Sequence, residues 1–264
     1  MLRIIGLYRR PPVAARACLA GLPLVLLLAP AVLSGGPGLR ADEPRPEQVS
    51  GFFRGAVHLA VAEGRAACVD GNAPFAGELR TLTAADIRWV GRGLEAVEAC
   101  AIRDDAVANA ILALTGDRPA PPNLKNASDI RAVLERLRIQ YRTTVQAPSC
   151  PYSAATRTQL EAAAVVGLEI GSAAAGTMCA IATWSHPLPV ALGRDVQGHL
   201  ESARAAIQIL GHGTQSIVKE LSGIADQIGS RHGDDVYAQL IVLADAIEST
   251  LAAGTAVPKS LPNK

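Results

Sequence analysis

The chain has few aromatic residues and little charge. Phe, Trp and Tyr make up 3% of its 264 residues and charged residues 19%, whereas hydrophobic residues make up 49%. Aromatic and β-branched residues favour strands, whereas Ala and Leu, which are abundant here, favour helices. Disordered chains are poor in apolar residues. The composition therefore argues against a β-rich fold and against disorder, and it favours helices.

The short motifs that identify many enzymes and metalloproteins are also missing. The sequence has no HExxH, ExxH, CxxCH, GxSxG or GxxxxGK arrangement, so the common zinc, di-iron, covalent-haem, serine-hydrolase and phosphate-loop signatures are absent. Asp195 and His199 lie one helical turn apart, a spacing that would let them share a metal ion. A solvated or capping role is favoured for His199 and His212, because the heptad pattern described below places neither on the apolar seam. We assign no catalytic residue, metal or cofactor.

Residues 1–41 have the order of a secretion signal. Four arginines and no acidic residue precede an apolar stretch over Ala17–Leu33, and small residues then lead to a cleavage site after Ala41. An uncleaved membrane anchor is the alternative, because the apolar stretch approaches the length that spans a bilayer. Pro23 and Pro30 favour a cleaved signal. The sequence predicts a periplasmic or secreted protein.

Cleavage changes the charge balance. Residues 1–41 contain five arginines and no acidic residue, so the net charge falls from +1 to about −4 on their removal. Binding to nucleic acid is therefore not expected. A predicted helix over 128–146 is locally basic, and contact with anionic lipid is one reading of it. A solvated outer face is favoured, because Asp129 and Glu135 are interspersed among its arginines.

The mature chain keeps an even number of cysteines. Cys18 lies inside the signal, and an exported chain with the four others is expected to form two disulfides. We prefer pairing between neighbours, Cys68 with Cys100 and Cys150 with Cys179, because each bond would join consecutive helices. The other two pairings stay open. Cys150 also precedes a predicted helix, where the helix dipole would favour a reactive thiolate, but a structural disulfide is the favoured role.

Polar and proline-rich stretches divide the chain. Thr83 and Asp86 have the spacing of a helix cap, and the three prolines over 116–123 cannot lie inside a helix. That stretch either divides two subdomains or joins two helices of one bundle. We expect a linker over 42–48, an N-terminal helical segment over 49–115, a proline-rich connection over 116–127, a helical bundle over 128–254 and a tail over 255–264.

Residues 162–184 contain a single charged residue, Glu169. This stretch is long enough to span a bilayer. A central helix surrounded by others is favoured, because Glu169 and the many Ala and Gly residues oppose membrane insertion. Gly167, Gly171 and Gly176 remove side-chain bulk, which indicates either close helix packing or room for a ligand.

Apolar residues recur at steps of four and three after Pro189, as in the seam of a coiled coil. The unbroken register predicts one long helix over about 194–230, kinked at Gly211 and Gly213, although two helices stay open. A last helix with the same spacing follows. We therefore predict an all-α fold, an antiparallel helical bundle with a long heptad-patterned C-terminal hairpin. The seam comprises Val196, Leu200, Ala203, Ile207, Leu210, Thr214, Ile217, Leu221, Ile224 and Ile228.

These patterns favour an exported bundle that acts by interaction, as a structural, adaptor or accessory protein. A partner helix or a second copy of the chain would pack on the seam. The second hypothesis is a small-ligand or cofactor binder with its pocket near the glycines of 162–184. An enzyme without a short motif is the third hypothesis. Membrane association would use an uncleaved signal or the 162–184 segment.

Overall fold

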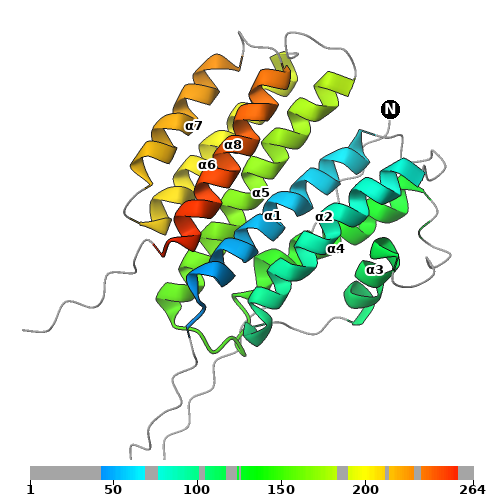
Figure 1. Cartoon of the computed structure of the whole chain (residues 1–264), viewed down its shortest axis with the longest axis vertical. Coiled ribbons are helices and arrows are strands. Elements are labelled where there is room, and N and C mark those ends of the chain that lie inside the picture. Colours follow the sequence, from blue (N-terminus) through cyan, green and yellow to red (C-terminus); the bar gives the residue numbers. More distant parts are fainter. Residues whose placement is uncertain are drawn as a thin grey trace, which may run out of the picture. The chain divides into compact units, whose positions relative to one another are not determined.

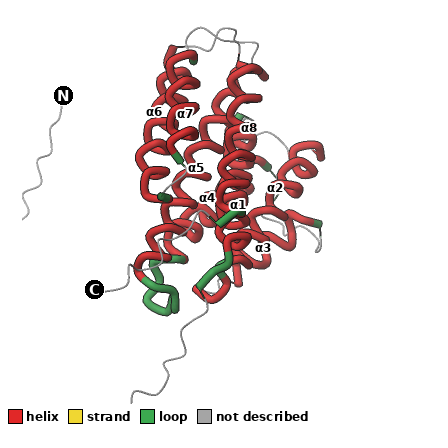
Figure 2. The backbone as a smooth tube through the Cα atoms, turned by 60° about the vertical axis from the view of Figure 1, so that its left-hand side comes forward, coloured by secondary structure: helices red, strands yellow, loops and turns green. Residues whose placement is uncertain are grey.

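The computed structural model of the chain describes residues 43–68, 77–100, 105–116, 124, 126–182, 190–211, 214–228 and 233–254. These residues belong to one compact unit. Within these ranges the regular elements are all helices, which confirms the all-α prediction for this part of the chain (Figure 2). The signal predicted over 1–41 and the tail predicted over 255–264 lie outside the described residues.

The helices begin close to helix-starting residues in the sequence. Pro46 opens the first helix, inside the linker predicted over 42–48, because proline lacks an N–H and its fixed φ suits the first turn. Asn126 caps the fourth helix by accepting a hydrogen bond from the backbone N–H of Asp129. The helices are α1 (Pro46–Ala67), α2 (Gly77–Ala96), α3 (Asp105–Thr115), α4 (Ala127–Thr144), α5 (Ala154–Ala182), α6 (Val190–Ile207), α7 (Gln215–Gln227) and α8 (Gly233–Ala252), with short 3₁₀ turns η1 (Glu98–Cys100) and η2 (Gln208–Leu210).

α1 and α5 lie between two groups of helices (Figure 1). One hydrophobic cluster joins them to α2, α3 and α4, and the other joins them to α6, α7 and α8. Phe52 and Phe53, adjacent in α1, belong to different clusters. α1 therefore buries two faces, and it contacts helices from both halves of the chain.

α1 and α5 approach so closely that glycine is needed at the contact. A Cβ placed at Gly167 would lie 2.6 Å from the carbonyl oxygen of Phe53, and one placed at Gly171 would lie 2.5 Å from that of Val57. Both distances are far shorter than van der Waals contact. Because the residue numbers rise together along the two helices, α1 and α5 run in the same direction. This pair departs from the antiparallel arrangement predicted from the sequence.

Tyr141 of α4 inserts between α1 and α2. Its hydroxyl donates to the carbonyl oxygen of Val90 at 3.0 Å, and its ring stacks on Phe52 with 4.8 Å between centroids. A Cβ placed at Gly55 or Gly93 would lie about 2 Å from the hydroxyl oxygen. The two glycines therefore leave the space that the fully buried tyrosine occupies.

The single helix predicted over 194–230 is wrong. α6 ends at Ile207, the η2 turn follows, Gly211 has φ of +97°, and α7 begins at Gln215. A positive φ cannot continue a right-handed helix, and glycine adopts it at little cost. The seam residues are nevertheless all buried, with Thr214 the most exposed at 8%. Since α6 packs on α5 and α7 packs on α6 and α8, both helices turn the same stripe inward.

α5 carries the apolar segment of the sequence prediction. Within the described residues it is the single helix long and apolar enough to cross a membrane, over Ala154–Met178. Of its apolar window, 72% is buried among the other helices. α5 is apolar on all sides because it lies between two groups of helices and is buried by both.

Candidate functional site

A cavity of about 390 Å³ opens between α1 and α8, with α2 at its edge. Its volume falls within the range of about 300–1,000 Å³ that small-molecule sites occupy. Its lining combines apolar and polar side chains, which is the mixture that binding sites use to hold and orient a ligand. The apolar side chains are Phe53, Val57, Val61, Ile241 and Ala244, and the polar ones are Arg54, His58, Arg65, Asp86, Tyr237, Asp245 and Glu248.

Three basic residues of α1 lie along the cavity. Arg54, His58 and Arg65 are separated by four and seven residues, spacings that bring side chains to one helix face. The neighbouring positions of α1 bury Phe, Val and Leu in the two hydrophobic clusters. Arg54, His58 and Arg65 therefore form a polar face of α1 that lies between α2 and α8 and lines the cavity.

Asp86 of α2 fixes two of these residues. Its side chain is 8% exposed, Oδ1 lies 2.8 Å from Nδ1 of His58, and Oδ2 accepts a hydrogen bond from Arg65. The sequence prediction of Asp86 as part of a helix cap with Thr83 is wrong, because α2 begins at Gly77 and Asp86 lies inside it. A buried carboxylate needs charged or hydrogen-bonding partners, and α1 supplies both.

Trp89 and Arg54 extend the polar arrangement toward α8. The Trp89 ring stacks on the His58 ring with 5.6 Å between centroids, and the Arg54 guanidinium lies 3.9 Å from the Trp89 centroid. Nη1 of Arg54 also donates to both carboxylate oxygens of Glu248, at 3.0 and 3.1 Å. Arg54 thus links α2 to α8, and the contacts hold its side chain in one position.

The arrangement limits the chemistry of the cavity. Asp86 engages Nδ1 of His58 and leaves Nε2, a geometry in which histidine can exchange protons. The described residues that line the cavity include no Ser, Thr or Cys to act as a nucleophile. In the described part of the chain, no group of three or more His, Cys, Asp or Glu could hold a metal ion. The apolar side chains beside Asp86, His58 and Arg65 can bind an organic molecule.

The glycines of α5 do not contribute to this cavity. Gly167 and Gly171 face the backbone of α1, which fills the space that the ligand hypothesis left open near them. Gly176 lies farther along α5 and is half-buried. The cavity lies instead on the side of α1 that meets α8. The seam residues of α6 and α7 are in the hydrophobic cluster shared with α8.

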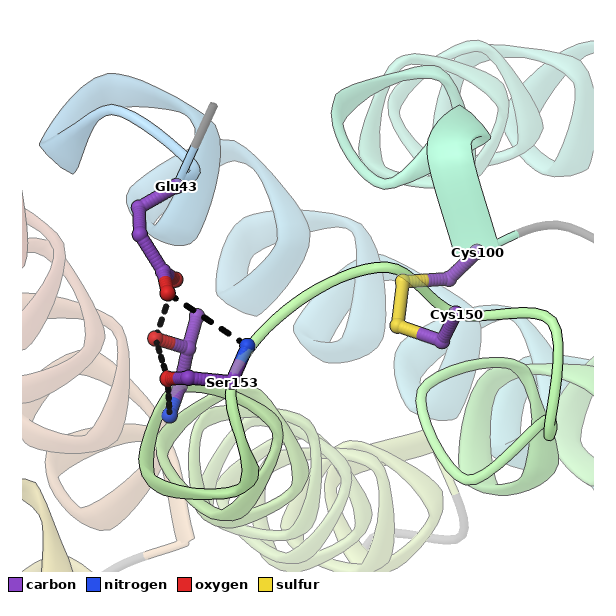
Figure 3. Close-up of a disulfide and its surroundings, with 5 residues drawn as sticks. Glu43, Cys100, Cys150 and Ser153 are labelled. Atoms are coloured by element: carbon purple, nitrogen blue, oxygen red, sulfur yellow. Dashed lines mark hydrogen bonds between the residues drawn. A yellow bond between two sulfur atoms is a disulfide. The ribbon is translucent and has the colours of Figure 1, made fainter. Parts of the chain in front are cut away.

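The structure joins Cys100 to Cys150 (Figure 3). The preferred pairing of Cys68 with Cys100 and of Cys150 with Cys179 is therefore wrong. The chain turns after α4 so that Cys150 meets η1 at the end of α2, and spatial neighbours across the fold replace sequence neighbours. Cys68 is also disulfide-bonded, and the side chain of Cys179 lies outside the described residues.

Beside this disulfide, Glu43 binds the N-terminus of α5 (Figure 3). Its carboxylate accepts from the backbone N–H of Ser153 at 3.3 Å and from the hydroxyl of Thr156. Ser153 caps the helix by accepting from the N–H of Thr156, as its sequence position predicts. Burial, together with the charges of Glu43 and Glu98, raises the pKa of Tyr152. These contacts fix the start of α5 and serve the fold.

Sequence reasoning missed the polar cluster around Asp86. The spacing of Arg54, His58 and Arg65 within an otherwise apolar helix was an available signal, because charged residues on a buried helix need partners. Their partner on α2, Asp86, could not be predicted from the sequence, because the contact depends on how α1 and α2 pack. Comparison of the chain with models of protein families, with curated proteins and with solved structures found no match.

Proposed function

We propose that this is an exported helical protein that binds a small organic molecule in the cavity between α1 and α8. The observation that carries the proposal is the buried carboxylate of Asp86, which holds His58 and Arg65 beside an apolar wall. Polar groups that are already fixed lose little conformational freedom on binding. This preorganisation is what a ligand site requires.

The proposal includes export. The basic, apolar and small-residue order of residues 1–41 supports a cleaved signal. The Cys100–Cys150 disulfide supports an oxidising compartment, because disulfides seldom persist in the cytosol. The periplasm or the extracellular space fits both features, and an N-terminal membrane anchor is the alternative.

The proposal also includes a bundle with a heptad-patterned C-terminal hairpin, in which the α6–α7 segment packs against α8 on coiled-coil-like contacts. The heptad spacing and the burial of Val196, Leu200 and Ile207 support it. The same burial weighs against the seam as a docking surface for a partner helix or a second copy. Interaction with another protein therefore stays a prediction that would need a different surface.

Native mass spectrometry of the protein from its own compartment tests ligand binding. We expect a mass above that of the disulfide-bonded mature polypeptide, which falls to the polypeptide mass when the cavity is filled by Ala244→Phe. Ala244 lines the cavity and is 7% exposed, so the new ring occupies ligand space. The matched control is Ala205→Phe on the exposed face of α6, which should keep the added mass.

Two results would overturn the proposal. The first is a wild-type protein with only the polypeptide mass under non-denaturing conditions. The second is an added mass that persists in Ala244→Phe when circular dichroism shows that the variant is folded. A binding site elsewhere would give the second result.

A further inference from the structure

We infer that the ligand carries an anionic group, of the carboxylate class, which binds at the end of the cavity formed by Arg65, Tyr237 and His58. This inference rests on the proposed function, because it names the chemistry of the same cavity. It follows from which hydrogen-bonding groups of the lining are already used and which are left.

Two of the acidic groups of the cavity are already satisfied. Asp86 receives one hydrogen bond on each oxygen, from His58 and from Arg65. Both oxygens of Glu248 accept from Nη1 of Arg54. These carboxylates therefore position the basic side chains and have little capacity left for a cationic ligand.

The unused capacity near Asp86 consists of donors. Arg65 has five N–H groups in a planar fork, and among the described residues Asp86 is its one side-chain partner, through Nη1. His58 keeps Nε2 after Nδ1 engages Asp86. A guanidinium with free N–H groups matches the two oxygens of a carboxylate, and such charge-assisted pairs are stronger than neutral hydrogen bonds.

Tyr237 adds a hydroxyl at the same end. α1 and α8 run in opposite directions, because Pro46 lies beside Gly254 and Arg54 pairs with Glu248. Tyr237 precedes Glu248 by the same number of residues that separate Arg54 from Arg65, so it reaches the level of Arg65. Both side chains line the cavity.

The remaining acid, Asp245, favours this placement. It lies on an exposed position of α8, close to Glu248 and one helical turn from it. Glu248 is paired with Arg54, whereas the carboxylate of Asp245 has no side-chain partner among the described residues. An unpaired carboxylate repels an anion, so the anionic group of the ligand is directed to the Arg65 end. The apolar part then lies along Val61, Ile241 and Ala244. The site fits an amphipathic organic acid.

Three probes of the same shape distinguish the ligand class: phenylacetate, phenylacetamide and 2-phenylethylamine. We expect titration calorimetry on the full mature protein to give phenylacetate an affinity at least tenfold above that of the other two. Arg65→Lys keeps a charge beside Asp86 but loses the fork, and Tyr237→Phe removes only the hydroxyl. Each should weaken phenylacetate about five- to tenfold and leave phenylacetamide unchanged. Arg136→Lys, at an exposed position of α4 outside the cavity, is the matched control and should change neither.

The inference is overturned if the amide or the amine binds as tightly as phenylacetate, or if Arg136→Lys weakens phenylacetate as much as Arg65→Lys. It is also overturned if none of the three binds to a wild-type protein from which endogenous ligand has been dialysed. None of these results removes the endogenous mass and its loss in Ala244→Phe. The experiments therefore test the class of the ligand and the existence of the site independently of each other.

Discussion

Glu169 of α5 lies 2.6 Å from Nδ1 of His199 of α6. Glu169 is the single charged residue in the apolar part of α5, and its side chain is 22% exposed. His199, expected to be solvated or capping, is 36% exposed and pairs with Glu169, a partner that the sequence did not predict. The histidine that the heptad pattern placed beside the seam satisfies the carboxylate that α5 would otherwise bury without a partner.

This contact predicts a measurable effect of Glu169→Gln. The substitution keeps the shape of the side chain and removes its charge, so it should lower the free energy of unfolding by about 1 kcal/mol. The measurement is urea denaturation at pH 6. Glu220→Gln, at an exposed position of α7, is the control and should change stability by less than about 0.5 kcal/mol. Equal effects of the two substitutions would contradict the role of the pair.

Two glycines of α2 should respond in opposite ways to alanine. A Cβ at Gly93 would lie 1.9 Å from the hydroxyl of Tyr141 and 3.0 Å from the carbonyl oxygen of Gly51, so Gly93→Ala should destabilise by about 1–3 kcal/mol. A Cβ at Gly91 would meet no atom within 4 Å among the described residues, so Gly91→Ala should stabilise by about 0.5–1 kcal/mol. Thermal unfolding followed by circular dichroism checks both. Destabilisation of similar size by both would contradict the role of the Tyr141 contact in setting Gly93 apart.

Removal of the Cys100–Cys150 disulfide should strongly destabilise the protein. The bond closes a loop of 50 residues, and the chain-entropy relation assigns such a closure about 4 kcal/mol. The double variant Cys100→Ala/Cys150→Ala should therefore unfold at much lower denaturant, with wild-type protein under the same non-reducing buffer as reference. A loss below about 1 kcal/mol would show that the bond does not constrain the unfolded chain.

Mapping the disulfides by mass spectrometry gives a separate prediction. With Cys100 and Cys150 joined, the sequence expectation that all four cysteines of the mature chain are bridged leaves Cys179 as the partner of Cys68. In agreement with this, Gly64 of α1 faces Ala175 of α5, and each cysteine follows four residues later: Cys68 directly after α1 and Cys179 within α5. Proteolysis without reduction should yield a peptide that links Cys68 to Cys179. A peptide that links Cys68 to any other residue would contradict it.

The ion pair of Glu63 and Arg138 predicts how stability depends on pH. Burial raises the pKa of Glu63 above the ordinary value of 4.5, and Arg138 offsets only part of this shift. The folded chain therefore holds this proton more tightly than the unfolded chain. The unfolding free energy consequently falls as pH rises from about 4.5 through the raised pKa.

Glu63→Gln removes this dependence, so the stability of the wild type relative to the variant should decline over that pH range. Chemical denaturation at pH 4, 5, 6 and 7 measures the difference, and Glu161→Gln at an exposed position of α5 is the control. A difference that grows with pH would show that Arg138 dominates over burial.

The sequence predicted the helices because each buries an apolar stripe. In α4, for example, Ile130, Leu134 and Leu137 recur at steps of four and three, and all three are buried. At the α6–α7 turn the same spacing gave a wrong prediction of one continuous helix. An apolar stripe indicates which side chains are buried, but it does not indicate where the backbone reverses. Gly211 permits a positive φ, but a glycine alone does not show whether the helix continues or the chain turns. The turn is favoured because α7 then packs on α6 and α8.

Contacts between helices could not be predicted in the same way. The pairing of Asp86 with His58 and Arg65, and that of Cys100 with Cys150, joins residues whose proximity depends on the directions of several helices. Local propensity carries no information about those directions. The candidate site is made almost entirely of such contacts. Its residues can be read from the sequence, but their proximity cannot be predicted from it.

The parallel contact of α1 with α5 has a consequence for the order of assembly. A chain synthesised from its N-terminus exposes the face of α1 that includes Phe53 and Val57 until α5 has been made, because α2, α3 and α4 come first. Contacts of such long sequence separation form slowly. We expect the incomplete chain to depend on chaperones that cover this apolar face before α5 is available.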